Sequence, residues 1–126
     1  MIPAWVNQYI GLPFEQCNCW QLVCRVYREQ LSIRLPFLDD RYENPYDKQA
    51  IAKLYQGELE RVWLKTDCPT VFSAAVFRIQ GQLWHVGIVV DKDTMLHTYD
   101  HINSALERFN NSVWQHRIEG FYNYVG

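Results

Sequence analysis

One amphipathic stretch near the N-terminus, from Cys17 to Pro36, constrains the fold more than any other part of the chain. Apolar residues recur there with the spacing of one helical face, namely Trp20, Val23, Cys24, Tyr27 and Leu31. The side chain of Asn18 can accept hydrogen bonds from the N–H groups of a first turn, and Pro36 cannot continue a helix. The pattern therefore predicts a buried helix that begins at Cys19 and stops before Pro36.

Cys19 falls in the first turn of this predicted helix. The unpaired N–H groups and the helix dipole favour a negative charge there. A thiol so placed can have a pKa of about 3.5–7.5 instead of about 8.5. Because the thiolate is the reactive form of cysteine, Cys19 is a candidate nucleophile.

Length and composition limit the classes of protein to consider. A chain of 126 residues is long enough for one core, so we expect a single domain that spans residues 1–126. A net charge of −2 provides no basic field to hold phosphates, which predicts no nucleic-acid partner. The N-terminal residues lack the features of a secretory signal, and no run approaches the ~18 apolar residues of a membrane span. We therefore expect synthesis without a signal peptide and no membrane insertion.

The periodicity changes from helical to strand-like after Pro69. A second helix is predicted over residues 49–59, with an interruption near Gly57, after an irregular arm or short helix at 2–14 and a surface excursion at 32–48. Strand-like runs follow at 71–79, 83–90, 94–99, 104–109 and 118–124, with turns at 80–82 and 91–93. Helices followed by strands imply an α+β domain, in which the cysteine helix packs against an antiparallel sheet of about five strands.

The four cysteines, at positions 17, 19, 24 and 68, admit three interpretations. They could form two disulfides or bind zinc, but a separation of one residue between Cys17 and Cys19 suits neither arrangement. The simpler interpretation places Cys24 in the core and Cys68 in a loop before Pro69. We therefore expect no metal site.

Two histidines lie on adjacent predicted strands. A thiolate nucleophile needs a base that moves protons and a group that orients the base. Side chains alternate between the two faces of a strand, so His85 lies on the same face as Gly87. The missing side chain of Gly87 leaves room there for the cysteine helix. The turn at 91–93 brings the next strand, with His97, alongside. We therefore predict that the two imidazoles are neighbours.

Two runs of sequence resemble the NlpC/P60 cysteine peptidases, papain-like enzymes that cut peptidoglycan stem peptides. The run NCWQLVCRVYREQLSIRLP, at 18–36, is similar to their nucleophile helix. The run HVGIVVDKDTMLHTYD, at 85–100, is similar to their histidine strand, turn and third-residue strand. The likeness extends from about Tyr9 onward and looks closest to the phage tail-associated branch, in which tryptophan follows the cysteine and the chain ends in a pattern like RIEGFYNY.

The resemblance implies a papain-like NlpC/P60 fold, with the nucleophile helix packed on the sheet, and a set of site residues. Cys19 would be the nucleophile, His85 the general base and acid, and His97 the residue that orients His85. The backbone N–H of Cys19 would hold the oxyanion, with Tyr9 or Gln16 as a second donor. The candidates for substrate contacts are Asn18, Trp20 and Trp84. The resemblance implies no metal and no organic cofactor.

The implied reaction is hydrolysis of an amide bond in a peptidoglycan stem peptide through an acyl-thioenzyme. Such a domain would act on the cell wall after delivery. In the phage-tail branch its partners would be tail proteins. A toxin delivered by a secretion machine would use the same chemistry, and its partner would be an immunity protein.

Departures from the family pattern support a second class of function. Asn18-Cys19-Trp20-Gln21 stands where the family commonly has Asp-Cys-Ser-Gly or, in the phage branch, Asp-Cys-Trp-Gly, and Phe14 lies near the place of a tyrosine that helps hold the oxyanion. These differences favour a catalytically impaired papain-like module with a structural or binding role in a larger assembly. An acyltransferase acting on lipids is a third hypothesis, and the lack of a membrane-seeking segment disfavours it.

Overall fold

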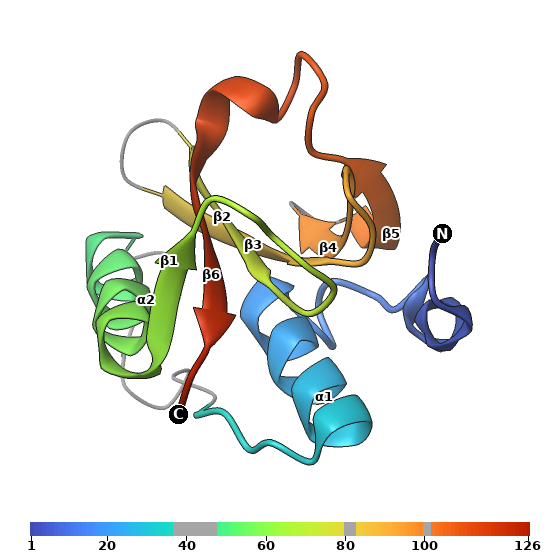
Figure 1. Ribbon diagram of the computed structural model, residues 1–126, viewed down its shortest axis with the longest axis horizontal. Helices are drawn as coiled ribbons and strands as arrows, with labels where there is room; N and C mark the ends of the chain where they lie inside the picture. The colour runs from blue at the N-terminus through green and yellow to red at the C-terminus, as the bar shows by residue number, and fades with distance from the viewer. Residues whose placement is uncertain (37–47, 80–82, 100–101) are drawn as a thin grey trace.

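The computed structural model describes residues 1–36, 48–79, 83–99 and 102–126, without the side chains of residues 48–52, 55, 83 and 84. Its helices precede its sheet in the chain, with one short helix inserted before the last strand (Figure 1). In order, the elements are η1 (Ala4–Tyr9), α1 (Cys19–Leu31), α2 (Lys48–Val62), β1 (Trp63–Thr66), β2 (Ala74–Ile79), β3 (Leu83–Val89), β4 (Thr94–Tyr99), β5 (Ile102–Arg108), η3 (Gln115–Arg117) and β6 (Ile118–Tyr124).

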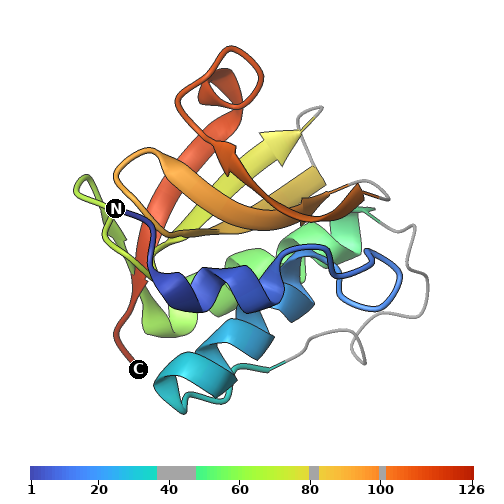
Figure 2. The ribbon, with the colours of Figure 1, turned by 90° about the vertical axis from the view of Figure 1, so that its right-hand side faces the viewer.

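Six strands form one antiparallel sheet in the order β1-β6-β2-β3-β4-β5. The helices α1 and α2 lie on one face, and the segment that contains η3 lies on the other (Figure 2). The α+β class is as predicted, but the expected number of about five strands was one too low. The missed strand is β1, whose four residues follow α2 directly and alternate too briefly to give a strand signal.

The start of α1 agrees with the sequence prediction. The Asn18 side chain accepts a hydrogen bond from the backbone N–H of Gln21 at 3.0 Å, and the Gln21 side chain accepts one from the backbone N–H of Asn18 at 3.0 Å. This reciprocal capping box satisfies two groups at the helix start, and loss of such a cap typically costs ~1 kcal/mol. The helix ends at Leu31, because Ser32 takes a left-handed conformation with φ 56° before Pro36 is reached.

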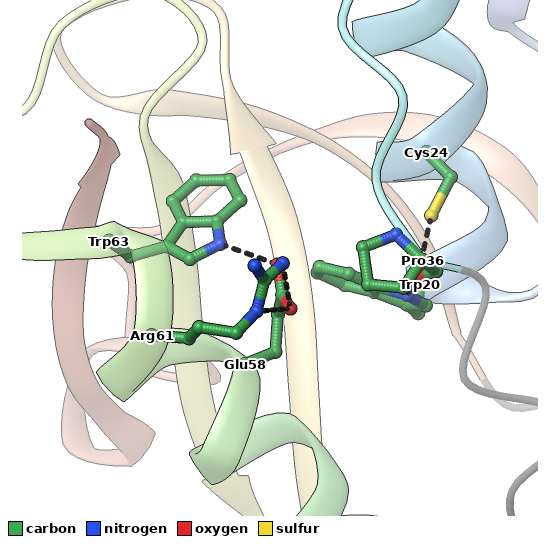
Figure 3. A network of polar contacts seen from close by, with 6 residues as sticks. All are labelled: Trp20, Cys24, Pro36, Glu58, Arg61 and Trp63. Atoms are coloured by element: carbon green, nitrogen blue, oxygen red, sulfur yellow. Dashed lines mark hydrogen bonds and ion pairs between the residues drawn. The ribbon is translucent and has the colours of Figure 1, made fainter. Parts of the chain in front are cut away.

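The helix α2 is continuous through Gly57, so the predicted interruption was wrong. A glycine in a helix costs ~1 kcal/mol relative to alanine, and contacts made by the following turn offset this cost. Glu58 is buried, and its carboxylate accepts a hydrogen bond from Nε1 of Trp63 at 3.1 Å. Arg61 pairs with the same carboxylate at 3.0 Å (Figure 3).

Each face of the sheet has its own hydrophobic core. The α1-side core lies between the sheet and α1 and includes Val86 and Ile88. The far core lies on the opposite face and includes Phe77 and Trp114. Successive side chains of a strand point to opposite faces, so the central strands are buried on both sides.

The remaining predicted elements are found with small shifts. The four runs from 83 to 124 correspond to β3, β4, β5 and β6, and the N-terminal arm contains η1. The first run begins at Ala74, since Phe72 has a positive φ of 77°. The predicted turn at 80–82 and residues 37–47 of the predicted excursion lie outside the described residues. In the described part of the chain, no helix is long and apolar enough to span a bilayer.

Candidate active site

Cys19 is the first residue of α1 and is partly buried. Its side chain packs against the α1-side core. The helix N-terminus favours an anion at this position. Burial raises the pKa of the Cys17 thiol, which lies just ahead of the helix. Cys19 is therefore better placed than Cys17 to act as a thiolate.

The two strand histidines contact each other, as predicted. The strands β3 and β4 pair in antiparallel register on either side of residues 91–93. The Nε2 atom of His85 lies 2.8 Å from the Nδ1 atom of His97, within hydrogen-bond distance. Both side chains point into the far core, where the rings contact Trp114.

A carboxylate that the sequence analysis missed continues this chain of contacts. Oε1 of Glu107 lies 3.0 Å from Nε2 of His97, and Oε2 of Glu107 accepts a hydrogen bond from Nε1 of Trp114 at 2.8 Å. The sequence feature that could have pointed to Glu107 is the alternation of side chains along β5. It places Ala105 and Glu107 on the face that carries His97. Only the register between β4 and β5 reveals that they are neighbours.

Aromatic rings enclose His85. Phe77 and Trp114 stack on the imidazole with centroid distances of 5.7 and 5.3 Å, and Tyr99 meets it edge-on at 4.9 Å. His85 is 2% exposed and His97 is 3% exposed. The imidazole is thus held in one orientation and is shielded from water.

Burial dominates the protonation of both histidines. Loss of hydration lowers the pKa of His85 well below 6.5, and the neighbouring His97 lowers it further. Loss of hydration also lowers the pKa of His97, although the carboxylate of Glu107 partly opposes this shift. Both rings are therefore neutral at pH 7.

These lowered pKa values predict that the protein loses stability in mild acid. Below pH 6.5 the unfolded chain binds protons that the folded chain does not, so the free energy of unfolding falls as the pH falls. The expected loss is ~1.4 kcal/mol per pH unit for each fully shifted histidine. Urea denaturation at pH 7.5 and at pH 5.5 measures it. His85→Phe is the matched comparison and should lose less stability over this interval, whereas an equal loss in both proteins would contradict the prediction.

The close approach expected at Gly87 involves β4, and the prediction that the cysteine helix fills this space was wrong. A Cβ atom at Gly87 would lie 2.9 Å from Sδ of Met95 and 3.3 Å from Cβ of His97. The reason is that Gly87 faces the far core, whereas α1 packs on the opposite face. The pairing of Cys19 with His85 stays a prediction.

The structure places the two proposed side-chain donors to the oxyanion differently. The hydroxyl of Tyr9 donates to Oε1 of Glu29 at 2.7 Å. Glu29 lies ten residues after Cys19 on α1, or about 15 Å along the helix axis. Tyr9 is therefore not beside the sulfur. Gln16 is exposed in the turn that precedes α1 and stays a candidate.

The three proposed substrate-contact residues also differ in their surroundings. Trp20 is a core residue: it is 4% exposed, and its Nε1 donates to the carbonyl of Pro36 at 2.7 Å (Figure 3). The amide oxygen of Asn18 is used in the helix cap. The side chain of Trp84 lies outside the described residues.

All four cysteines lie in the described part of the chain, and none of them forms a disulfide. Cys24 is in the α1-side core, as predicted, and Cys68 is exposed. Within the described residues, no three histidine, cysteine, aspartate or glutamate side chains are grouped so that they could hold a metal ion.

Comparison with known proteins supports the fold. No protein-family model matches the sequence, and no curated protein matches it. The structure is similar to the crystal structure of a Staphylococcus aureus protein described as similar to a lipoprotein of the NLP/P60 family, with a TM-score of 0.66 and 17% sequence identity. The match covers 96% of this chain and 39% of that protein, so this chain spans about two fifths of its length. The chain therefore has an NLP/P60-like α+β fold of the papain-like type.

Proposed function

We propose that the protein is a cysteine hydrolase that cuts an amide bond in the stem peptides of peptidoglycan. The observation that carries this proposal is the His85–His97 contact, continued by Glu107, in an NLP/P60-like fold that places Cys19 at a helix N-terminus. A cysteine, a base and an orienting group are the components of nucleophilic amide hydrolysis.

The reaction follows from the chemistry of these three side chains. The neutral His85 takes the proton of the Cys19 thiol as the sulfur attacks the amide carbonyl, and the backbone N–H of Cys19 holds the oxyanion. His85 donates this proton to the leaving amine, and the C–N bond breaks to give an acyl-thioenzyme. His85 then removes a proton from water, which attacks the thioester, and returns that proton to the departing sulfur. His97 holds the imidazole of His85 through both steps.

The enclosure of His85 favours a second candidate function, a papain-like module with a structural or binding role. The residue is 2% exposed, and Phe77, Tyr99 and Trp114 surround its imidazole. Hydrolysis requires the sulfur and the imidazole to come within hydrogen-bond reach, about 2.6–3.2 Å between heavy atoms in most enzymes. A binding module has no such requirement.

The rate of alkylation of Cys19 at different pH values tests the proposal without knowledge of the substrate. The Cys68→Ala protein removes the exposed thiol, and mass spectrometry of the intact protein follows the modification of Cys19. We expect rapid reaction well below pH 8 and a loss of this reactivity in His85→Ala, because the neutral His85 removes the proton of the thiol as the sulfur reacts. A Cys19 that is inert, or that reacts like an ordinary thiol in both proteins, would favour the binding module.

We further propose that this domain acts on the wall after delivery, either on a phage tail or as a secreted toxin. The two routes differ in their protein partners, which are tail proteins in the first and an immunity protein in the second. A neighbourhood of tail genes supports the first route, and an adjacent immunity gene supports the second.

A further inference from the structure

Glu107 contacts two different kinds of nitrogen. One carboxylate oxygen lies 3.0 Å from Nε2 of His97, and the other accepts the N–H of Trp114 at 2.8 Å. An imidazole nitrogen can donate or accept, depending on its tautomer, whereas an indole N–H can only donate. The oxygen of the residue 107 side chain that faces Trp114 must therefore be an acceptor.

The proton positions follow along the chain from Glu107. A carboxylate only accepts hydrogen bonds, so Nε2 of His97 carries the proton in this contact. Nδ1 of the neutral His97 ring is then an acceptor, and it receives the N–H at Nε2 of His85. Nδ1 of His85 keeps its lone pair.

We infer that Glu107 is a positioning residue that sets the tautomers of both histidines and leaves Nδ1 of His85 as the nitrogen that exchanges protons with the sulfur and the substrate. The role in proton exchange rests on the proposed function. The tautomers themselves do not, because they follow from the contacts among Glu107, Trp114 and the two rings.

Glu107→Gln should reverse the chain of hydrogen bonds. Because Trp114 must donate, the amide oxygen of the new side chain turns toward it and the amide N–H group turns toward His97. His97 then accepts at Nε2 and donates from Nδ1 to His85, which must carry its own proton at Nδ1. The reacting nitrogen has lost its lone pair, although the size and shape of the side chain at position 107 are unchanged.

Tautomers can be read directly from the nitrogen chemical shifts and long-range couplings of ¹⁵N-labelled imidazoles at neutral pH. We expect both buried histidines of the wild-type protein to carry the proton at Nε2, and both in Glu107→Gln to carry it at Nδ1. Trp114→Phe alone should keep the wild-type tautomers. Trp114→Phe combined with Glu107→Gln should show both forms, because either end of the amide can then face His97. The exposed His116 is the internal reference, and thermal unfolding checks that each variant is folded.

Wild-type tautomers in Glu107→Gln, or no change when Trp114→Phe is added to it, would overturn the inference. The rate of Cys19 alkylation in the same proteins separates this result from the proposed function. A reversed tautomer with a large drop in the alkylation rate, up to about 10⁴-fold by analogy with the wrong tautomer of a serine-protease triad, supports both. A reversed tautomer with a Cys19 that is inert in every protein supports the role of Glu107 and removes the hydrolase.

Discussion

Replacing Cys19 with alanine is expected to abolish hydrolysis of purified peptidoglycan while the fold remains intact. No other side chain in the proposed mechanism can form the acyl intermediate, and loss of the nucleophile from a comparable triad costs about 10⁶-fold in rate. Cys19 is only partly buried and the capping box is made by Asn18 and Gln21, so truncation should change stability little. The release of new amino groups from the wall, together with thermal unfolding, measures both effects.

The matched control for this substitution is Cys68→Ala, which removes an exposed thiol far from α1 in the sequence. It should hydrolyse the wall at the wild-type rate. Wild-type turnover by Cys19→Ala would exclude Cys19 as the nucleophile. In the opposite outcome, the wild-type protein releases no amino groups from any type of wall, and its Cys19 is alkylated at the rate of an ordinary thiol. These two results together would leave the binding module as the function.

The parts of the fold that the sequence predicted well depend on short-range patterns. The start of α1 was predictable because Asn18 and the apolar spacing lie within one helix length. The contact between His85 and His97 was predictable because residues 91–93 form a turn between two strands of known period. In both cases the partners are close in sequence, so local geometry fixes their placement.

The choice of sheet face could not be predicted from the sequence. The alternation in β3 separates His85 from Val86, but both faces of this strand are apolar and buried. Nothing in the pattern indicates which face α1 covers, and the prediction that α1 fills the space at Gly87 assumed the wrong one. The sequence alone therefore could not predict whether Cys19 contacts His85.

Glu107 and Trp114 illustrate a second limit of sequence analysis. Glu107 reaches His97 through the register of β4 and β5, and Trp114 reaches Glu107 from the segment that follows β5. Each residue viewed alone is an ordinary strand carboxylate or an ordinary core aromatic. Their shared contact gives them a role, and only the three-dimensional structure reveals it.

His85→Ala is expected to abolish turnover, whereas His97→Ala is expected to leave a measurable rate. His85 both withdraws and returns protons, and general acid–base catalysis alone contributes about 10²–10⁴-fold. His97 acts on the substrate only through His85, which Phe77 and Trp114 also hold by stacking. We therefore expect a loss at least about tenfold smaller in His97→Ala, measured as the steady-state rate of wall hydrolysis.

His97→Gln sharpens the comparison, because a glutamine amide can reproduce both hydrogen bonds of the neutral His97 ring. Its oxygen can accept from Nε2 of His85 while its N–H group donates to Glu107, which preserves the tautomer of His85. The rate should therefore fall in the order wild type, His97→Gln, His97→Ala, His85→Ala. Equal rates in His97→Ala and His85→Ala would mean that His97 takes part in proton transfer itself. A rate in His97→Gln as low as that in His97→Ala would mean that ring packing, and not the chain of hydrogen bonds, holds His85 in place.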